Sequence, residues 1–357
     1  MKIAIDTQTI LGQPTGFGYY VKNLVESLQK IDSKNKYLLF ATDQAKDLYT
    51  MERFLWDQFK FPFKSSRAKA DILHQPCFSV PIFYRGKKVV TVHDIIPVLF
   101  PENLPLVSRL FYSKWMTFTY KYTDMIITDS QCTKNDLVKH LKINPEKIRV
   151  IYLAVSESFK PERSLDKLQK TKTKYKTGEK YFIHVGTLEP RKNLLFLVRA
   201  YAQAVKRGLK ENLIIVGKKG WYYDDLFSLV KDLKLEKRVI FTGYADDQDI
   251  PALYSGATAL TFPSVYEGFG FPPLEAMACG TPVITSNTSS LPEVVGEAGI
   301  LLPPKDEKKW AENMLKLAGN RALSGKLREA GLKQAKNFSW VATAEQTIEV
   351  YEKMAAK

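Results

Sequence analysis

Two glutamates, eight residues apart, mark the segment of this chain whose residue types and spacing best support chemistry. Glu267 and Glu275 flank a turn that contains Gly268 and Gly270, and a strand-like run, 259–262, comes just before it. The glycines let the backbone approach a ligand closely, and two prolines after the turn suit the start of a helix. The N–H groups at such a helix end attract phosphate, and the carboxylates can accept hydrogen bonds from sugar hydroxyls. The alternative is a capped helix whose dipole favours nearby acids.

A pair of adjacent cations forms the second candidate. Arg191 and Lys192 follow the strand-like run 181–185 and precede a helical pattern. Negative charge builds up on a nucleoside diphosphate as it departs, and fixed cations beside it stabilise that charge without a metal. The alternative is an ordinary basic pair on the surface.

A glycine-rich turn, Gly12–Gly18, joins the first strand-like run to a helical pattern over 19–28. Gly16 and Phe17 lie in this turn, where the backbone could pass close to a donor phosphate. Because residue 21 is valine, the turn is not a complete Gly-x-Gly-x-x-Gly motif, and alone it is weak evidence.

Four further residues are candidates because they follow strand-like runs. His93 and Asp94 close the run 88–92, although a single histidine at a strand end is more often structural than catalytic. Lys218 and Tyr244 follow two later runs and could border a nucleotide, or belong to plain turns. The residues 247–249 match an Asp-x-Asp metal motif, but they precede a helical pattern, so N-capping explains them better.

The elements that must position these residues alternate between short apolar runs and helical patterns, which predicts parallel sheets in an α/β fold. We expect two doubly wound domains, with ligands beyond the carboxyl ends of the strands and a cleft between the domains. The region 156–180 is lysine-rich and is interpreted as a linker with a short polar helix. The predicted strands are 1–5, 37–40, 72–74, 88–92, 125–128 and 149–152 in the first half, and 181–185, 213–216, 238–242, 259–262, 282–285 and 299–302 in the second.

Taken together, these motifs resemble the retaining glycosyltransferases of family 4, which have the GT-B fold. The pattern Glu-x7-Glu with its aromatic and glycine filling, Glu-Pro-Arg-Lys-Asn over 189–193, and His-Asp-x-x-Pro over 93–97 carry the resemblance, which covers nearly the whole chain. It implies two Rossmann-like domains facing a central cleft. Residues 1–160 would form the acceptor domain, 175–337 the nucleotide-sugar donor domain, and the last helix, within 338–357, would cross back to the first domain.

The resemblance also implies roles for individual residues. His93, Arg191, Lys192 and Glu267 would be catalytic, with the two cations on the diphosphate and the two other side chains near the donor sugar. Glu275 would hold the ribose. The other expected donor-binding residues are Gly16, Phe17, Lys218, Tyr244, Phe269, Gly270 and Phe271. One departure is Thr187, which stands where many relatives have arginine, so Arg191 is expected to take over that role.

Composition bounds the partners. The formal net charge of +15 favours an anionic partner, and the chain lacks the common nucleic-acid-binding motifs. The three isolated cysteines and four separated histidines form neither a disulfide framework nor a zinc motif, which favours a reducing compartment. The segment 105–122 mixes aromatic and basic residues, so it is either a helix that lies on an anionic membrane surface or a helix that covers the sheet. We therefore expect a cytoplasmic protein, peripheral on the inner face of the membrane if this helix docks.

The resulting hypothesis is a retaining, metal-independent transfer of a hexose to a glycan or lipid-linked acceptor, without a cofactor. The motifs look most like the mannosyltransferase-like members, which implies GDP-mannose as donor. The alternatives are a UDP-sugar donor, a nucleotide-sugar epimerase, a sugar phosphorylase, for which no pyridoxal site is evident, and a non-catalytic nucleotide-sugar-binding protein.

Overall fold

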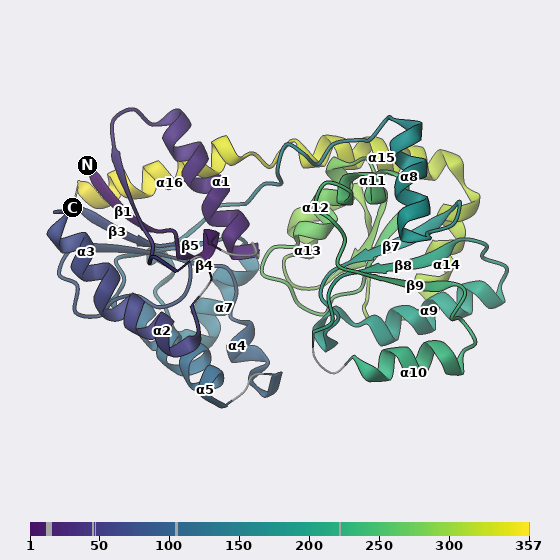
Figure 1. Cartoon of the computed structure of the whole chain (residues 1–357), viewed down its shortest axis with the longest axis horizontal. Helices are drawn as coiled ribbons and strands as arrows, with labels where there is room; N and C mark the ends of the chain where they lie inside the picture. Colours follow the sequence, from purple (N-terminus) through teal and green to yellow (C-terminus); the bar gives the residue numbers. More distant parts are fainter. Residues whose placement is uncertain (12–15, 45, 47, 104–105, 221–222, 357) are drawn as a thin grey trace. The chain divides into compact units, whose positions relative to one another are not determined.

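The structure is a computed structural model that describes residues 1–11, 16–44, 46, 48–103, 106–220 and 223–356. The chain divides into two compact units (Figure 1). Unit 1 comprises Met1–Ala154 together with Ser339–Lys357, and unit 2 comprises Val155–Phe338. Each unit is described by itself below.

Unit 1 is built on a six-stranded sheet in the order β2-β1-β3-β4-β5-β6, in which every described pairing is parallel. Val89 and Val90 on the central strand β4 are fully buried, as expected for a parallel sheet covered on both faces. The strands are β1 (Lys2–Asp6), β2 (Lys36–Phe40), β3 (Ile72–Gln75), β4 (Lys87–Val92), β5 (Met125–Thr128) and β6 (Ile148–Val150).

Unit 1 contains helices from both ends of the chain, because the C-terminal helix returns to this unit as predicted. In α16, the Tyr351 hydroxyl lies 2.6 Å from His74 Nδ1 of β3. The helices are α1 (Gly16–Ile31), α2 (Thr50–Leu55), α3 (Phe61–Arg67), α4 (Ile96–Leu99), α5 (Leu106–Arg109), α6 (Met116–Thr119), α7 (Gln131–Leu141) and α16 (Trp340–Ala355). Two π-helical stretches, η2 (Trp56–Lys60) and η4 (Leu110–Trp115), and four 3-10 turns, η1 (Gln8–Ile10), η3 (Pro101–Asn103), η5 (Tyr120–Tyr122) and η6 (Pro145–Lys147), complete it.

Unit 2 repeats the architecture with a six-stranded parallel sheet in the order β12-β11-β10-β7-β8-β9. Its strands are β7 (Tyr181–Val185), β8 (Asn212–Val216), β9 (Val239–Gly243), β10 (Ala259–Phe262), β11 (Val283–Ser286) and β12 (Ile300–Leu302). Its helices are α8 (Leu165–Tyr175), α9 (Leu194–Lys206), α10 (Asp224–Asp232), α11 (Ile250–Ser255), α12 (Phe271–Ala278), α13 (Leu291–Val295), α14 (Glu307–Gly319) and α15 (Arg321–Ala335), with 3-10 turns η7 (Pro190–Lys192) and η8 (Gly296–Ala298).

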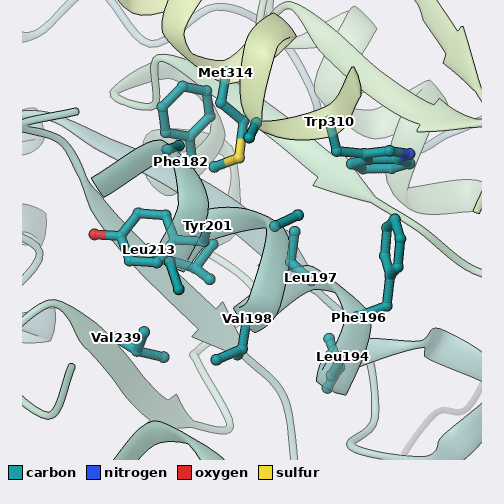
Figure 2. Close-up of a cluster of buried hydrophobic side chains, with 14 of the residues drawn as sticks. Phe182, Leu194, Phe196, Leu197, Val198, Tyr201, Leu213, Val239, Trp310 and Met314 are labelled. Carbon is teal, nitrogen blue, oxygen red and sulfur yellow. The ribbon is translucent and has the colours of Figure 1, made fainter. Parts of the chain in front are cut away.

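The core of unit 2 holds β7 in place, and Arg191 and Lys192 come shortly after this strand. On α9, Leu194, Leu197, Val198 and Tyr201 have the i, i+3, i+4, i+7 spacing of one helix face and are buried. They lie in the cluster of Figure 2 with residues of β7, β8 and α14. There the ring of Phe196 meets Trp310 edge to face at 5.7 Å. This packing holds β7 and the start of α9 in place on both sides of η7.

All twelve predicted strands are present, and their ends agree with the prediction within about two residues. The polar helix predicted within 156–180 is α8, which is tied to the rest of unit 2 through Lys174 and Tyr175. The capping role predicted for Asp249 is wrong. Asp249 occupies the N-cap position of α11, but its side chain makes no capping bond there. Its carboxylate instead accepts hydrogen bonds from α8, where a lysine ammonium provides a stronger, charge-assisted partner.

Candidate active site

The two cations and the first glutamate come together in unit 2 because β7 and β10 are neighbours in the sheet. The carboxyl ends of adjacent parallel strands lie at the same edge, so the turns that follow them meet there. Backbone bonds join these turns: Val265 N–H donates to the carbonyl of Arg191 at 3.0 Å. Arg191 and Lys192 lie on η7, and Glu267 lies in the turn between β10 and α12.

Glu267 is the centre of a compact ion-pair cluster. Lys192 Nζ lies 2.5 Å from Glu267 Oε1, and Arg191 Nη1 lies 2.9 Å from Oε2. The hydroxyl of Ser264 donates to Oε1 at 2.6 Å, and Arg191 also pairs with Glu189. We call these five residues (Glu189, Arg191, Lys192, Ser264 and Glu267) the strand-end cluster. Its two cations and two carboxylates give it a formal charge near zero.

Most of the cluster is buried, and burial opposes the charged forms of both Glu267 and Lys192. Burial by itself raises the pKa of Glu267, but the charges of Lys192 and Arg191 outweigh it and hold this pKa at about 2. For Lys192, burial is the larger effect and lowers the pKa, although the charge of Glu267 partly offsets it. The Glu267 carboxylate therefore favours the charged form of Lys192 against the effect of burial.

Two serines and a glycine shape the turn that carries Glu267. The hydroxyl of Ser290 donates to the carbonyls of Glu267 and Phe269, at 2.9 and 2.7 Å, and Ser289 Oγ accepts from the Glu267 N–H at 2.9 Å. Gly270 has a φ of 110° at the N-cap position of α12, a left-handed conformation that favours glycine. The turn is therefore held in one shape from the strand end to the helix start.

The second glutamate has a different environment. Glu275 lies on α12 and is partly buried, and its Oε2 accepts a hydrogen bond from the Tyr254 hydroxyl at 2.9 Å. Burial raises the pKa of Glu275 to about 7; the bond from Tyr254 lowers it, and the charge of Asp247 raises it. Its protonation therefore changes near neutral pH.

The remaining predicted donor residues of unit 2 lie in turns at the same strand ends or at the start of α12. Phe269 is buried and contacts Phe271 edge to face, with ring centroids 5.5 Å apart. Lys218 is exposed after β8, and its carbonyl accepts from the Leu188 N–H at 3.0 Å. Tyr244 is exposed after β9, and its hydroxyl donates to Asp247 at 2.8 Å. Lys218 and Tyr244 thus stand apart from the strand-end cluster in their contacts.

In unit 1, the structure brings His93 and Phe17 together. His93 follows β4, and its ring stacks on Phe17 of α1 with centroids 5.0 Å apart. Tyr20, one turn further along α1, meets the imidazole edge to face at 4.7 Å. Gly16 is exposed at the first position of α1, and a side chain there would meet nothing within 4 Å. The predicted loop residues 12–15 lie outside the described part of the chain.

Asp129 is the partner of His93 that the sequence analysis missed. Its Oδ2 lies 2.5 Å from His93 Nδ1, and the carbonyl of Pro76 accepts from Nε2 at 3.0 Å. Val92 pairs with Thr128 in the register of β4 and β5, so the next residue of each strand, His93 and Asp129, must meet. The register of β4 and β5 is therefore the feature from which the contact between His93 and Asp129 could have been predicted. We call His93 and Asp129 the imidazole pair.

Both nitrogens of His93 face acceptors, so an imidazolium that donates from each satisfies them best. Burial lowers the pKa of His93, but the charge of Asp129 and its hydrogen bond outweigh it and raise this pKa above its ordinary value. A hydroxyl contact from either nitrogen, as predicted for a donor sugar, would require one of these two bonds to open. Asp94 turns aside and accepts from the Ile96 N–H at 2.8 Å.

Two observations concern metals and membranes. Among the residues that the structure describes, no group of three or more His, Cys, Asp and Glu side chains could hold a metal ion. Within the same residues, no helix is both long and apolar enough to cross a membrane.

Comparison with known families covers both halves of the chain. Residues 39–159 match the model of Glycosyltransferase Family 4, and residues 166–336 match that of Glycosyl transferases group 1. The chain is 34% identical over 283 residues to the O-antigen chain mannosyltransferase B of Escherichia coli, covering 79% of this chain and 74% of that protein.

Solved structures share the whole fold. Sucrose-phosphate synthase from Thermosynechococcus elongatus superposes with a TM-score of 0.78 at 22% identity, covering 100% of this chain and 99% of that one. Anabaena Alr3699/HepE in complex with UDP-glucose superposes with a TM-score of 0.75 at 20% identity, covering 99% of this chain and 100% of that one.

Proposed function

Because the chain belongs to the family 4 glycosyltransferases with the GT-B fold, we propose that it transfers mannose from GDP-mannose to a hydroxyl of a glycan or lipid-linked acceptor. The anomeric configuration is retained, and neither a metal nor a cofactor takes part. The observation that carries the proposal is the strand-end cluster, in which a buried lysine and a partly buried arginine pair with a buried, strongly acidic glutamate at the edge of a parallel sheet. Mannose as the transferred sugar is supported by the similarity to the Escherichia coli protein that is named a mannosyltransferase.

The cluster supplies what departure of a nucleoside diphosphate needs. Lys192 and Arg191 provide positive charge beside the leaving phosphates, where a buried setting strengthens it. A diphosphate takes over these cations from Glu267, and the released carboxylate then accepts hydrogen bonds from the donor sugar. This exchange gives both cations an anionic partner before and after binding, while Glu267 exchanges its cations for hydroxyl donors.

Retention follows from the face on which the acceptor attacks. The acceptor hydroxyl attacks the anomeric carbon on the face from which the phosphate leaves, and the departing phosphate oxygen takes the hydroxyl proton. Glu267, held ionised by two cations, is a weak base and a hydroxyl acceptor more than a nucleophile. At the other end of the turn, Glu275 accepts from the ribose hydroxyls, and the start of α12 faces the phosphates.

A UDP-sugar is the second candidate donor, because the HepE neighbour was solved with UDP-glucose. Within the same fold, an epimerase would convert the donor without an acceptor, and a non-catalytic protein would bind it unchanged.

The test measures thermal stabilisation by GDP, UDP, ADP, GDP-mannose and UDP-sugars, with and without EDTA. A ligand that binds only the native state raises the melting temperature. We expect a selective shift with GDP and GDP-mannose that EDTA does not change and that Lys192→Ala removes. A selective shift with a UDP-sugar would replace the donor, and no shift with any nucleotide would reject the donor site.

A second assay follows the product by NMR with an oligosaccharide acceptor. Retention predicts an α-linked mannoside from the α-linked donor, and a β-linked product would overturn the proposed stereochemistry. Conversion of the donor without an acceptor would identify an epimerase, and binding without turnover would indicate a non-catalytic protein.

A further inference from the structure

An exposed apolar stripe runs along a helical stretch of unit 1 to which no role has been assigned. Thr50–Arg67 is continuously helical, as α2, η2 and α3 follow one another without a break. Every fourth residue of this stretch is exposed and apolar: Met51, Leu55, Phe59 and Phe63, of which Phe63 is 68% exposed. We call these four the Met51 stripe. Because Trp56 and Phe61 on the other face are fully buried, the helix is already anchored to the core without the stripe.

The π-helical turn in the middle keeps the stripe in line. In an α-helix, residues four apart drift by about 40° per step around the axis, always in the same sense. The wider turn of η2 rotates less per residue and so reverses this drift. Residues at a spacing of four therefore stay on one side over the whole stretch.

A second stretch of unit 1 repeats this design. The helices α5, η4, α6 and η5 follow one another from Leu106 to Tyr122, again with a π-helical turn inside. Leu106, Leu110, Lys114, Phe118 and Tyr122 recur at a spacing of four and are all exposed, with Leu106 at 67%. We call these five the Leu106 stripe. It lies in the segment 105–122, for which the sequence left open a helix on a membrane surface or a helix that covers the sheet.

Aromatic contacts join the two stripes into one surface. Phe54 lies between Phe59 and Trp115, with ring centroids 6.2 and 5.3 Å away. Trp115 in turn contacts Phe118 of the second stripe at 6.1 Å. In Figure 1, α2 and the stretch that begins with α5 lie in the same part of unit 1, and the contact between Phe54 of α2 and Trp115 of η4 joins them.

The first stripe also borders a hollow of about 670 Å³. Phe59 and Phe63 line one part of it, and Phe83, which is 79% exposed, lines another. Lys60 and Arg85 contribute cationic groups to the same lining. The hollow is large enough for part of a lipid hydrocarbon chain, and its two cations could pair with the headgroup of the same lipid.

The exposed charges on the two stretches themselves have a single sign. On the two stretches, Thr50–Arg67 and Leu106–Tyr122, all five exposed charged side chains are cations: Lys60, Lys64, Arg67, Lys114 and Lys121. The two acids on these stretches, Glu52 and Asp57, are partly and fully buried. An apolar centre with a cationic rim fits an interface of hydrocarbon and anionic headgroups.

We infer that the Met51 and Leu106 stripes together dock unit 1 on an anionic lipid bilayer. The apolar side chains enter the boundary between headgroups and acyl chains, and the lysines pair with anionic headgroups. A second copy of this chain fits less well, because a twofold contact would bring the cations of both copies face to face. The inference goes beyond the transfer reaction and does not depend on the nucleotide.

The test is sedimentation of the full chain with vesicles of phosphatidylcholine alone and of phosphatidylcholine with phosphatidylglycerol. We expect binding to the anionic vesicles only, weakening as salt is raised. Phe63→Ser with Leu110→Ser, one change in each stripe, lowers the affinity about tenfold per side chain. The triple variant Lys60→Gln, Lys114→Gln, Lys121→Gln lowers it on the order of 100-fold.

Matched changes elsewhere serve as controls. Leu165→Ser removes a leucine of α8 that is 80% exposed, and Lys305→Gln with Lys308→Gln and Lys316→Gln removes three exposed lysines of unit 2. These controls should bind vesicles like the wild type, and all variants should keep its melting temperature. No binding to anionic vesicles at low salt, or equal loss in the controls, would overturn the inference. Self-association in ultracentrifugation that Phe63→Ser with Leu110→Ser abolishes, without vesicle binding, would assign the surface to a second copy instead.

Discussion

The strand-end cluster of unit 2 and the imidazole pair of unit 1 arise from the same topology but balance charge in different ways. In both, two turns meet because the strands before them are neighbours in a parallel sheet. In unit 2, Glu267 is shared by two cations, so it has two partners that a phosphate could take over. In unit 1, both donors of His93 are already bound, to Asp129 and to a backbone carbonyl that cannot move away independently.

The difference shows how one fold supports two kinds of site. The strand-end cluster is held by ion pairs between flexible side chains, which can exchange partners when an anion arrives. The imidazole pair is held by a ring between two fixed acceptors and stacked on Phe17, which keeps a single charge in a single place. Variants that remove one member of each should therefore have unequal effects.

The largest effect is expected for Lys192→Ala. Without this ammonium, the leaving diphosphate loses one of its two buried cations, and transfer should slow by on the order of 1,000-fold. The measurement is kcat with the donor identified by thermal shift. Lys308→Ala removes an exposed lysine of unit 2 that is not among the expected donor-binding residues and is the control, expected to change kcat by less than about threefold. Equal losses in the two variants would remove the distinction between buried and exposed cations.

A smaller loss is expected for Glu267→Gln, together with an opposite change in nucleotide affinity. Removal of the carboxylate frees Arg191 and Lys192, so GDP alone should bind as tightly as to the wild type or more tightly. Transfer should slow by on the order of 100-fold, because a sugar hydroxyl loses its charged acceptor. Calorimetry with GDP and steady-state kinetics separate the two effects. Weaker GDP binding would show that Glu267 supports the cations more than it competes for them.

The same variant carries a stability test with a defined sign. Since the pKa of Glu267 is about 2, below its ordinary 4.5, its ionised form stabilises the folded state at neutral pH. This contribution is lost as the pH falls from about 4.5 towards 2. In urea unfolding across this range, the free energy of unfolding of the wild type should fall as the pH falls, and this fall should be smaller in Glu267→Gln. Equal pH dependence in the two proteins would mean that the ion pairs of Glu267 contribute little to stability.

The fold was predictable from sequence to a greater extent than the sites. Strands such as Met125–Thr128 are short apolar runs between helical patterns, and that local signal is enough for parallel sheets. Asp129 was missed because it is far in sequence from His93, and only the order and register of β4 and β5 bring the two together. Glu189 and Ser264 are close in sequence to Arg191 and Glu267, but the direction of their side chains depends on the shape of the turns, which residue spacing alone does not give.

The Met51 stripe was missed for another reason. Within Thr50–Arg67, apolar residues lie on both the buried and the exposed face, so hydrophobic spacing does not tell them apart. The π-helical turn aligns the stripe, but it leaves no distinct pattern in the sequence. Its i→i+5 hydrogen bonds join backbone groups and require no particular residue type. Burial had to be seen in the structure.

An intermediate effect is expected for Asp129→Asn. Without the carboxylate charge, burial dominates and should bring the pKa of His93 below its ordinary value. This fall lowers the protonated fraction of His93 at neutral pH, by less than about tenfold for each pKa unit, and transfer should slow in proportion if the charge is used. The pKa is measured by NMR titration of the histidine ring, and Asp124→Asn, an exposed carboxylate at the start of β5, is the control.

Stability should report the same change. Because the pKa of His93 is raised, its charged form stabilises the folded state below its unfolded value of 6.5, and this stabilisation is lost as the pH rises through the folded value. Asp129→Asn should remove that slope. An unchanged His93 pKa in the variant would mean that the charge of Asp94 and the carbonyl of Pro76, and not Asp129, fix the charge of His93.

The smallest effect contrasts the two glutamates of one turn and helix. The pKa of Glu267 is held at about 2 by cations, whereas Glu275 has a tyrosine as its described hydrogen-bond partner, and burial raises its pKa to about 7. If Glu275 holds the ribose as a carboxylate, nucleotide affinity should rise about three- to tenfold between pH 6 and 8. Glu275→Gln should abolish this rise, and Glu297→Gln, an exposed carboxylate in η8, should keep it.

Tyr254→Phe sharpens this last test because it changes the pKa without removing the carboxylate. The Tyr254 hydroxyl donates to Glu275 and lowers its pKa, so its loss should move the midpoint of the affinity profile to higher pH. Folding should respond in the opposite sense to that for Glu267: a raised carboxyl pKa makes the folded state less stable as the pH rises from about 4.5 through 7. A midpoint that stays in place in Tyr254→Phe, or that survives in Glu275→Gln, would assign the titration to another group and leave Glu275 as a structural acid at the start of α12.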